Sequence, residues 1–121
     1  MGAYVILLGH SSDKLGDALI QIDALTVRGS FYACDIADEV SLERAYAEII
    51  AQHSKVDILV TCAAAPAISG KFEDTSLQQW RSLLSIDLDG VFLACRIFGR
   101  SMVQKGYGRI VNLTSFHNVA T

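Results

Sequence analysis

Hydrophobic residues gather in four short runs along the chain, and stretches with a helical period of apolar positions separate them. The runs are Ala3–Leu8, Gly29–Ala33, Ile58–Thr61 and Arg109–Leu113. In the first and third runs the apolar residues are continuous, which is typical of strands covered on both faces. We therefore predict four buried strands joined by helices.

Apolar residues at helical spacing predict the first two helices. Each is preceded by side chains that can accept hydrogen bonds from the free N–H groups of a first turn. We expect Ser11 or Ser12 to cap the first helix, and Asp38 or Ser41 to cap the second. The apolar stripes comprise Leu15, Ala18, Leu19, Ile22 and Leu25 in the first helix and Leu42, Ala45, Tyr46, Ile49 and Ile50 in the second.

The third helical region is longer. Thr75-x-x-Gln78 has the pattern of a capping box, so we predict that the helix begins there. A break is expected near Asp87–Gly90, after which a mostly apolar helix runs to Lys105 and stops at Gly106. Helices that join buried parallel strands make βαβ crossovers. The order of elements therefore predicts an α/β fold with an incomplete, doubly wound parallel sheet of about four strands and three helical crossovers.

The composition excludes several classes of protein. Of the 121 residues, 51% are hydrophobic and 19% are charged, which indicates one globular domain rather than a disordered chain. The net charge of −3 gives no electrostatic reason to expect nucleic acid or an anionic membrane as a partner. No apolar run approaches the roughly 20 residues of a membrane span, and no signal-peptide pattern opens the chain.

The three cysteines, Cys34, Cys62 and Cys95, are odd in number and unclustered. This usage predicts a reduced, cytoplasmic setting with neither a disulfide nor a metal site. We expect all three to be buried as small hydrophobic residues.

Two polar positions that follow predicted strands are candidates for chemistry. Asp35 comes directly after the second strand, where it could instead bond loop amides while Asp38 caps the next helix. Ser115 follows the last strand, at the sheet edge where open α/β folds hold their ligands. A hydroxyl that caps a loop is the alternative for Ser115. His117, close by, is interpreted as a substrate-loop or surface residue.

Several motifs follow one another in a distinctive order. They are Cys34-Asp35-Ile36-Ala37-Asp38, Asp57–Ala64, Trp80, Asp87–Gly90, Met102 and Gly108–Ser115. Their order and spacing resemble the middle of a short-chain dehydrogenase/reductase, from the second strand of that family's Rossmann-like sheet to the fifth. The resemblance implies an NAD(P)-dependent oxidoreductase that transfers hydride to or from a small carbonyl or alcohol substrate.

The resemblance implies catalytic roles for two residues. Ser115 stands where the family has a serine that hydrogen-bonds the substrate oxygen as charge develops there. Asp87 occupies the position of an asparagine whose backbone holds a water in the proton relay toward the catalytic lysine. A polar residue that satisfies carbonyl groups at a helix break is the structural alternative for Asp87.

The resemblance also implies a cofactor site. Asp35, with Ile36 after it, would accept a hydrogen bond from the adenine amino group. Cys62, Ala63 and Ala64 would lie beside the ribose. In that loop Thr61 and Cys62 replace two asparagines and Ala64 replaces a glycine, but small residues still let the backbone approach a ligand closely.

The residues after the first strand favour NADP over NAD. Related chains hold an acidic residue there for the ribose 2′-hydroxyl or a basic one for a 2′-phosphate. This chain has no carboxylate at Gly9, whereas His10, the hydroxyls of Ser11 and Ser12, and Lys14 can meet a phosphate.

The sequence has no counterpart of two parts of the family fold. The glycine-rich first βα unit and the Tyr-x-x-x-Lys segment are absent from residues 1–121, which we expect to form a single partial domain, inactive alone. In the family's sheet the first strand lies between those that correspond to this chain's first and third. Its absence separates two strand pairs and leaves open hydrogen-bonding edges, so that either the two halves close up, another chain fills the gap, or the parent protein is longer.

Two other functions stay open from the residues. A catalytically silent remnant would act only as a binding partner. A flavodoxin- or receiver-like signalling domain would need a lysine after the last strand, and none follows Lys105. A homo-oligomer is expected through the helix Val91–Val103, because its apolar residues spread around much of the circumference and the family pairs this helix with its twin.

Overall fold

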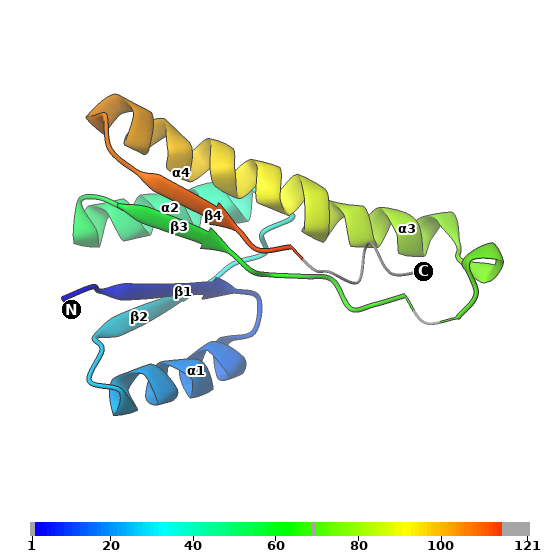
Figure 1. Cartoon of the computed structure of the whole chain (residues 1–121), viewed down its shortest axis with the longest axis horizontal. Coiled ribbons are helices and arrows are strands. Elements are labelled where there is room, and N and C mark those ends of the chain that lie inside the picture. The colour runs from blue at the N-terminus through cyan, green and yellow to red at the C-terminus, as the bar shows by residue number, and fades with distance from the viewer. Residues whose placement is uncertain (1, 69, 115–121) are drawn as a thin grey trace.

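Strands and helices alternate along the chain, as the sequence predicts, in a computed structural model that describes residues 2–68 and 70–114. The α/β class with parallel strands is confirmed (Figure 1). The elements are β1 (Val5–Gly9), α1 (Ser12–Ala24), β2 (Gly29–Ala33), α2 (Glu39–His53), β3 (Ile58–Thr61), η1 (Phe72–Asp74), α3 (Leu77–Leu84), η2 (Ser85–Gly90), α4 (Val91–Lys105) and β4 (Arg109–Asn112).

The described strands form two separate parallel pairs, β1 with β2 and β3 with β4. The first pair runs in register from Val5 opposite Gly29 to Gly9 opposite Ala33. The second runs from Ile58 opposite Arg109 to Thr61 opposite Asn112. Of the alternatives that the sequence leaves open, the two halves have not closed up into one sheet, and each pair keeps open edges.

The core lies beneath α2 and α4 and reaches both strand pairs. Helix α4 packs on β3, β4 and α2, whereas α1 packs on β1 and β2 and has no fully buried residue (Figure 1). Ile6 and Leu8 of β1 pack against the core from the other strand pair. Its buried members are Cys34, Leu42, Ala45, Ile49, Leu59, Leu93, Ala94, Ile97, Phe98 and Met102.

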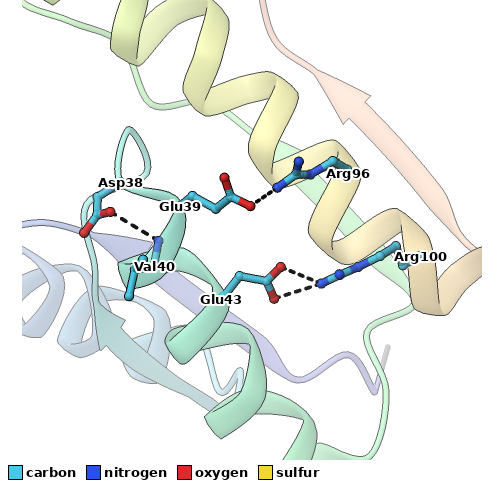
Figure 2. Close-up of polar contacts among 6 residues, drawn as sticks. All are labelled: Asp38, Glu39, Val40, Glu43, Arg96 and Arg100. Carbon is cyan, nitrogen blue, oxygen red and sulfur yellow. Dashed lines mark hydrogen bonds and ion pairs between the residues drawn. The ribbon is translucent and has the colours of Figure 1, made fainter.

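Two ion pairs join the rim of the contact between α2 and α4. Glu39 pairs with Arg96, and Glu43 pairs with Arg100 at 2.7 Å and 2.8 Å from its two carboxylate oxygens (Figure 2). These side chains are partly exposed, so each pair contributes less than about 1 kcal/mol to stability. The buried apolar contact, rather than these charges, holds the two helices together.

The N-caps of the first two helices are among those expected. The Oγ of Ser11 accepts from the Lys14 amide at 3.4 Å, and Oδ1 of Asp38 accepts from the Val40 amide at 3.2 Å (Figure 2). Because a side-chain oxygen here meets an otherwise unpaired N–H group, these residues fix where the helices begin.

The capping box of α3 lies one residue later than predicted. It joins Ser76 to Gln79, with Ser76 Oγ accepting from the Gln79 amide at 3.2 Å and Gln79 Oε1 accepting from the Ser76 amide at 2.9 Å. The prediction of Thr75 with Gln78 is wrong. Thr75 closes the short helix η1 instead, since its amide donates to the Phe72 carbonyl at 3.0 Å.

The predicted break near Asp87–Gly90 is not a break. The chain passes through one wider π-helical segment, η2, and the helix continues from α3 into α4 (Figure 1). Gly90 is buried there, and a Cβ atom would lie 3.0 Å from Ile36 Cδ1 and 3.3 Å from the Ile36 carbonyl oxygen. The glycine therefore serves close packing of the helix against the loop after β2, rather than helix termination.

We predict that Gly90→Val destabilises the fold by about 2 kcal/mol, because the added methyl groups would press on Ile36 in a packed contact. Gly16→Val is the matched control, since nothing lies within 4 Å of a Cβ at that helical position. The control should change the free energy of unfolding by less than about 0.5 kcal/mol. Urea denaturation of both variants measures the difference, and equal effects would contradict the packing role of Gly90.

Candidate active site

The carboxyl ends of the strands gather at one side of the molecule, and the predicted site residues follow them (Figure 1). His10 follows β1, and Asp35 comes two residues after the end of β2. Cys62, Ala63 and Ala64 follow β3 directly, and all three are exposed. In parallel sheets this edge is where loops present their groups to ligands.

Asp35 organises its own turn. Its Oδ1 accepts from the Ala37 amide at 2.9 Å, and its amide donates to Ser41 Oγ at 3.2 Å. The structural role left open by the sequence is therefore present. An ionised carboxylate has more acceptor positions than one amide uses, so Asp35 keeps capacity to accept from a ligand. Ile36 beside it is half-buried against Gly90.

Cys34 lies directly behind Asp35 in the core. Burial raises the pKa of its thiol, the neighbouring charge of Asp35 raises this pKa further, and a hydrogen bond with the Gly9 backbone opposes the shift. A thiol held protonated in this way is a packing group rather than a nucleophile. The expectation of burial holds for Cys34 but is wrong for Cys62, which is exposed on the loop beyond β3, and Cys95 is only half-buried.

Asp87 fixes the loop after β3. Its Oδ1 accepts from the Ala65 amide at 2.7 Å, so a residue of η2 holds a backbone group 22 positions earlier in the chain. Because an ionised carboxylate only accepts hydrogen bonds, it binds this N–H group rather than the helix carbonyl groups considered from the sequence. The structure thus brings Asp87 to the segment that contains Cys62, Ala63 and Ala64.

A polar cluster at the ends of β3 and β4 was missed in the sequence. Asn112 Oδ1 accepts from Thr61 Oγ1 at 2.8 Å and from Cys95 Sγ at 3.6 Å. Thr61 and Asn112 lie opposite each other in the parallel register. A polar residue near the end of each of these two predicted strands was the sequence feature that could have indicated the cluster. The cluster ties α4 and both strands together where the loops of the site begin.

The remaining predicted site residues are His10, Ser11, Ser115 and His117. Ser11 is engaged as the cap of α1, and His10 is exposed beside it. Ser115 and His117 lie outside the described residues. Strand β4 ends at Asn112, three residues before Ser115 in the sequence.

The described residues show neither a metal site nor a membrane span. Across residues 2–68 and 70–114, no three His, Cys, Asp or Glu side chains gather as metal ligands would. Within the same residues, no helix has the length and apolar character needed to cross a membrane.

The sequence profile of the short chain dehydrogenase family matches residues 1–120. The chain belongs to this family. Its curated relatives include D-threitol dehydrogenase of Mycolicibacterium smegmatis, 40% identical over 84 residues, or 69% of this chain and 32% of the relative. NAD-dependent glycerol dehydrogenase of Listeria innocua is 36% identical over 114 residues, or 94% of this chain and 43% of the relative. The chain thus spans less than half the length of these curated relatives.

Solved structures of the short-chain dehydrogenase type share the fold. A metagenomic short-chain oxidoreductase in complex with NADP superposes with a TM-score of 0.87 at 25% identity, covering 94% of this chain and 52% of the other. A protein from Burkholderia xenovorans, described as a short-chain dehydrogenase/reductase, has a TM-score of 0.91 at 31% identity, covering 99% and 47%. NAD⁺-bound xylitol dehydrogenase, at 24% identity and a TM-score of 0.90, supports the fold alone; 97% of this chain and 45% of that one align.

We predict that Asp87→Ala speeds hydrogen exchange of the Ala65 amide about tenfold, because a hydrogen bond to a charged group contributes about 1.5 kcal/mol. Asp87→Asn should retain most of the protection, since its side-chain oxygen can still accept. Asp89→Ala, two residues further along the same segment, is the control for the lost charge. NMR measures the exchange rate of each amide. An unchanged exchange rate of the Ala65 amide in Asp87→Ala would contradict the hydrogen bond between Asp87 and Ala65.

Proposed function

We propose that the protein serves hydride transfer between a nicotinamide dinucleotide and a small carbonyl or alcohol substrate, with its site on the carboxyl edge of the strands. The observation that carries the proposal is the hydrogen bond from the Ala65 amide to Asp87, which sets the loop after β3 beside η2. Membership of the short-chain dehydrogenase family supplies the class of reaction.

The residues at this edge fit a dinucleotide. Asp35 retains acceptor capacity for an adenine amino group, with Ile36 beside it. The exposed Cys62, Ala63 and Ala64 leave their backbone open to a ribose, because two of them have only a methyl side chain.

We propose NADP as the preferred cofactor and NAD as the alternative. His10 is exposed, Ser11 caps α1 and Lys14 lies in its first turn, at the helix end where N–H groups and the helix dipole favour an anion. No carboxylate stands at Gly9 to repel a 2′-phosphate.

The chain's own groups would then act as follows. The bound dinucleotide supplies or accepts the hydride. Ser115 would donate a hydrogen bond to the substrate oxygen, where negative charge develops. Asp87, whose side chain is occupied by the loop, would offer its backbone to a water in the proton relay. The family's acid/base pair has no counterpart in residues 1–121, so we propose that these residues alone turn over no carbonyl substrate.

A catalytically silent remnant that only binds a longer relative would share this inactivity, and it predicts a stable complex on co-expression with that relative. The flavodoxin- or receiver-like alternative loses its basis, because the chain belongs to the short-chain dehydrogenase family.

We also propose a cytoplasmic location, in keeping with the free cysteines among the described residues.

We predict that NADPH shifts the NMR signals of Asp35 and Ile36, and that Asp35→Ala weakens this binding about tenfold by removing a charged acceptor. Asp38→Asn is the matched control on the same turn, because asparagine also caps helices well. NADH is expected to bind more weakly than NADPH. Binding that is equal in Asp35→Ala and the unaltered chain, or NADPH oxidation that depends on both a carbonyl substrate and Ser115, would contradict the proposal.

We further propose a homo-oligomer through α4, with a narrower contact than the sequence indicates. Most of its apolar residues are buried in the protein's own core, including Ile97 and Phe98. Phe92 and Val103 remain exposed, at 59% and 81%, and they lie on one stripe of the helix together with Gly99. This stripe, rather than the whole circumference, is the surface available to a second copy.

We predict that Val103→Asp weakens self-association through this stripe about tenfold, since it places a charge in an apolar contact. Gln104→Asp, at the adjacent exposed position, is the control and should leave association unchanged. Sedimentation equilibrium at tens of micromolar measures both. If Val103→Asp and the control behaved alike, the α4 stripe would not be an interface.

A further inference from the structure

The outer edge of β2 is open. Among the described strands β2 pairs only with β1, so its other side faces away from the sheet. Unpaired strand edges carry N–H and C=O groups that can bind another strand.

The hydrogen bonds between β1 and β2 show which backbone groups of β2 face outward. The Val5 amide donates to the Arg28 carbonyl at 3.0 Å, and the Cys34 amide donates to the Gly9 carbonyl at 2.8 Å. Backbone groups alternate in direction along a strand, so Arg28 and Cys34, together with every second residue between them, bond toward β1. Phe31 and Ala33 therefore present their N–H and C=O groups to the open edge.

A groove runs between this edge and α2. It has a volume of about 300 Å³ and is lined on the strand side by Phe31, Tyr32 and Ala33. Arg44, Ala45 and Glu48 line it on the helix side. A groove bounded by an open strand edge and a helix accommodates one further strand.

The helix side of the groove carries one positive and one negative charge, a single turn apart. Arg44 and Glu48 are both exposed, and neither takes part in the ion pairs found within residues 2–68 and 70–114. The other acidic residues of α2, Glu39 and Glu43, are engaged with α4 on a different side of the helix.

We infer that this edge binds a second copy of the same chain, with two β2 strands antiparallel about a two-fold axis at Tyr32. Phe31 of each copy would then lie opposite Ala33 of the other, and their outward N–H and C=O groups would exchange four hydrogen bonds. The pairing joins two sheet edges and uses none of the residues of the α4 stripe.

The charges identify a second copy as the occupant. Helix α2 runs antiparallel to β2, as βαβ crossovers require, so Arg44 lies nearer the Ala33 end of the groove and Glu48 nearer the Phe31 end. A two-fold axis reverses this order in the second copy. Arg44 of each chain therefore faces Glu48 of the other, and the surface is self-complementary in the way an isologous contact demands.

Charge reversal provides the test, made in the Val103→Asp background so that the α4 stripe does not contribute. Arg44→Glu and Glu48→Arg should each raise the dissociation constant of the dimer about tenfold, because every charge pair across the axis becomes repulsive. An equimolar mixture of the two variants should recover the original affinity as a heterodimer. The double variant R44E/E48R should recover it as a homodimer. Lys14→Glu, on α1, is the control for net charge.

A backbone variant separates strand pairing from surface charge. Ala33→Pro removes an outward N–H group without removing a bond to β1, so it should weaken the dimer while circular dichroism stays unchanged. Sedimentation equilibrium measures the dimer dissociation constant of every variant and of the mixture. Single variants that associate as the parent does, or a mixture no tighter than its components, would overturn the inference. Loss in the single variants without recovery in the mixture would assign the groove to another extended segment, and would equally overturn the second copy as occupant.

Discussion

The buried contact between α2 and α4 holds the molecule together. No backbone hydrogen bond joins the two strand pairs among the described residues, so contacts through the helices and their side chains must fix how the pairs lie. Leu42 and Ile49 of α2 meet Ile97 and Phe98 of α4 in the core, and Tyr46 meets Phe98 edge to face with ring centroids 5.1 Å apart. Burial of such side chains contributes about 1.5–3 kcal/mol each, well above the partly exposed ion pairs at the rim.

The geometry of the candidate site depends on this contact. The loop after β2 carries Asp35, and the loop after β3 is held by Asp87, so the two belong to different strand pairs. Segment η2, which carries Asp87, packs against Ile36 of the loop after β2 at Gly90 and so links the two. A side chain at position 90 would press on Ile36, next to Asp35, and so disturb the packing between η2 and the loop after β2.

Much of the fold could be predicted from the sequence, because strands and helices follow local patterns. The four strands needed only periodicity, and capping chemistry narrowed each of the first two caps to a pair of residues that includes the observed Ser11 or Asp38. The errors arose where two local signals competed. Thr75 and Ser76 are both able caps, and the preceding turn of η1 decides between them. A glycine within a helical pattern suggests a break. At Gly90, however, the glycine is needed for close packing against Ile36, a tertiary contact that no local pattern contains.

Less of the site could be predicted, for the same reason. The position of Asp35 after its strand is a sequence feature, and so is its bond to the nearby Ala37 amide. The bond between Asp87 and Ala65 and the cluster of Thr61, Cys95 and Asn112 join residues far apart in the chain. Such contacts depend on how the helices lie across the sheet.

The open strand edges differ in how well they are covered. The edges of β1 and β3 face the space between the two strand pairs, where the core beneath α2 and α4 covers one side of them. The outer edge of β2 has no such shelter, yet it is short and is flanked by the opposite charges of Arg44 and Glu48. Charges beside an exposed edge discourage indiscriminate strand pairing, because a partner strand must match them or leave them uncompensated. One arrangement that matches them is the two-fold related copy, so the feature that protects this edge also selects what can bind it.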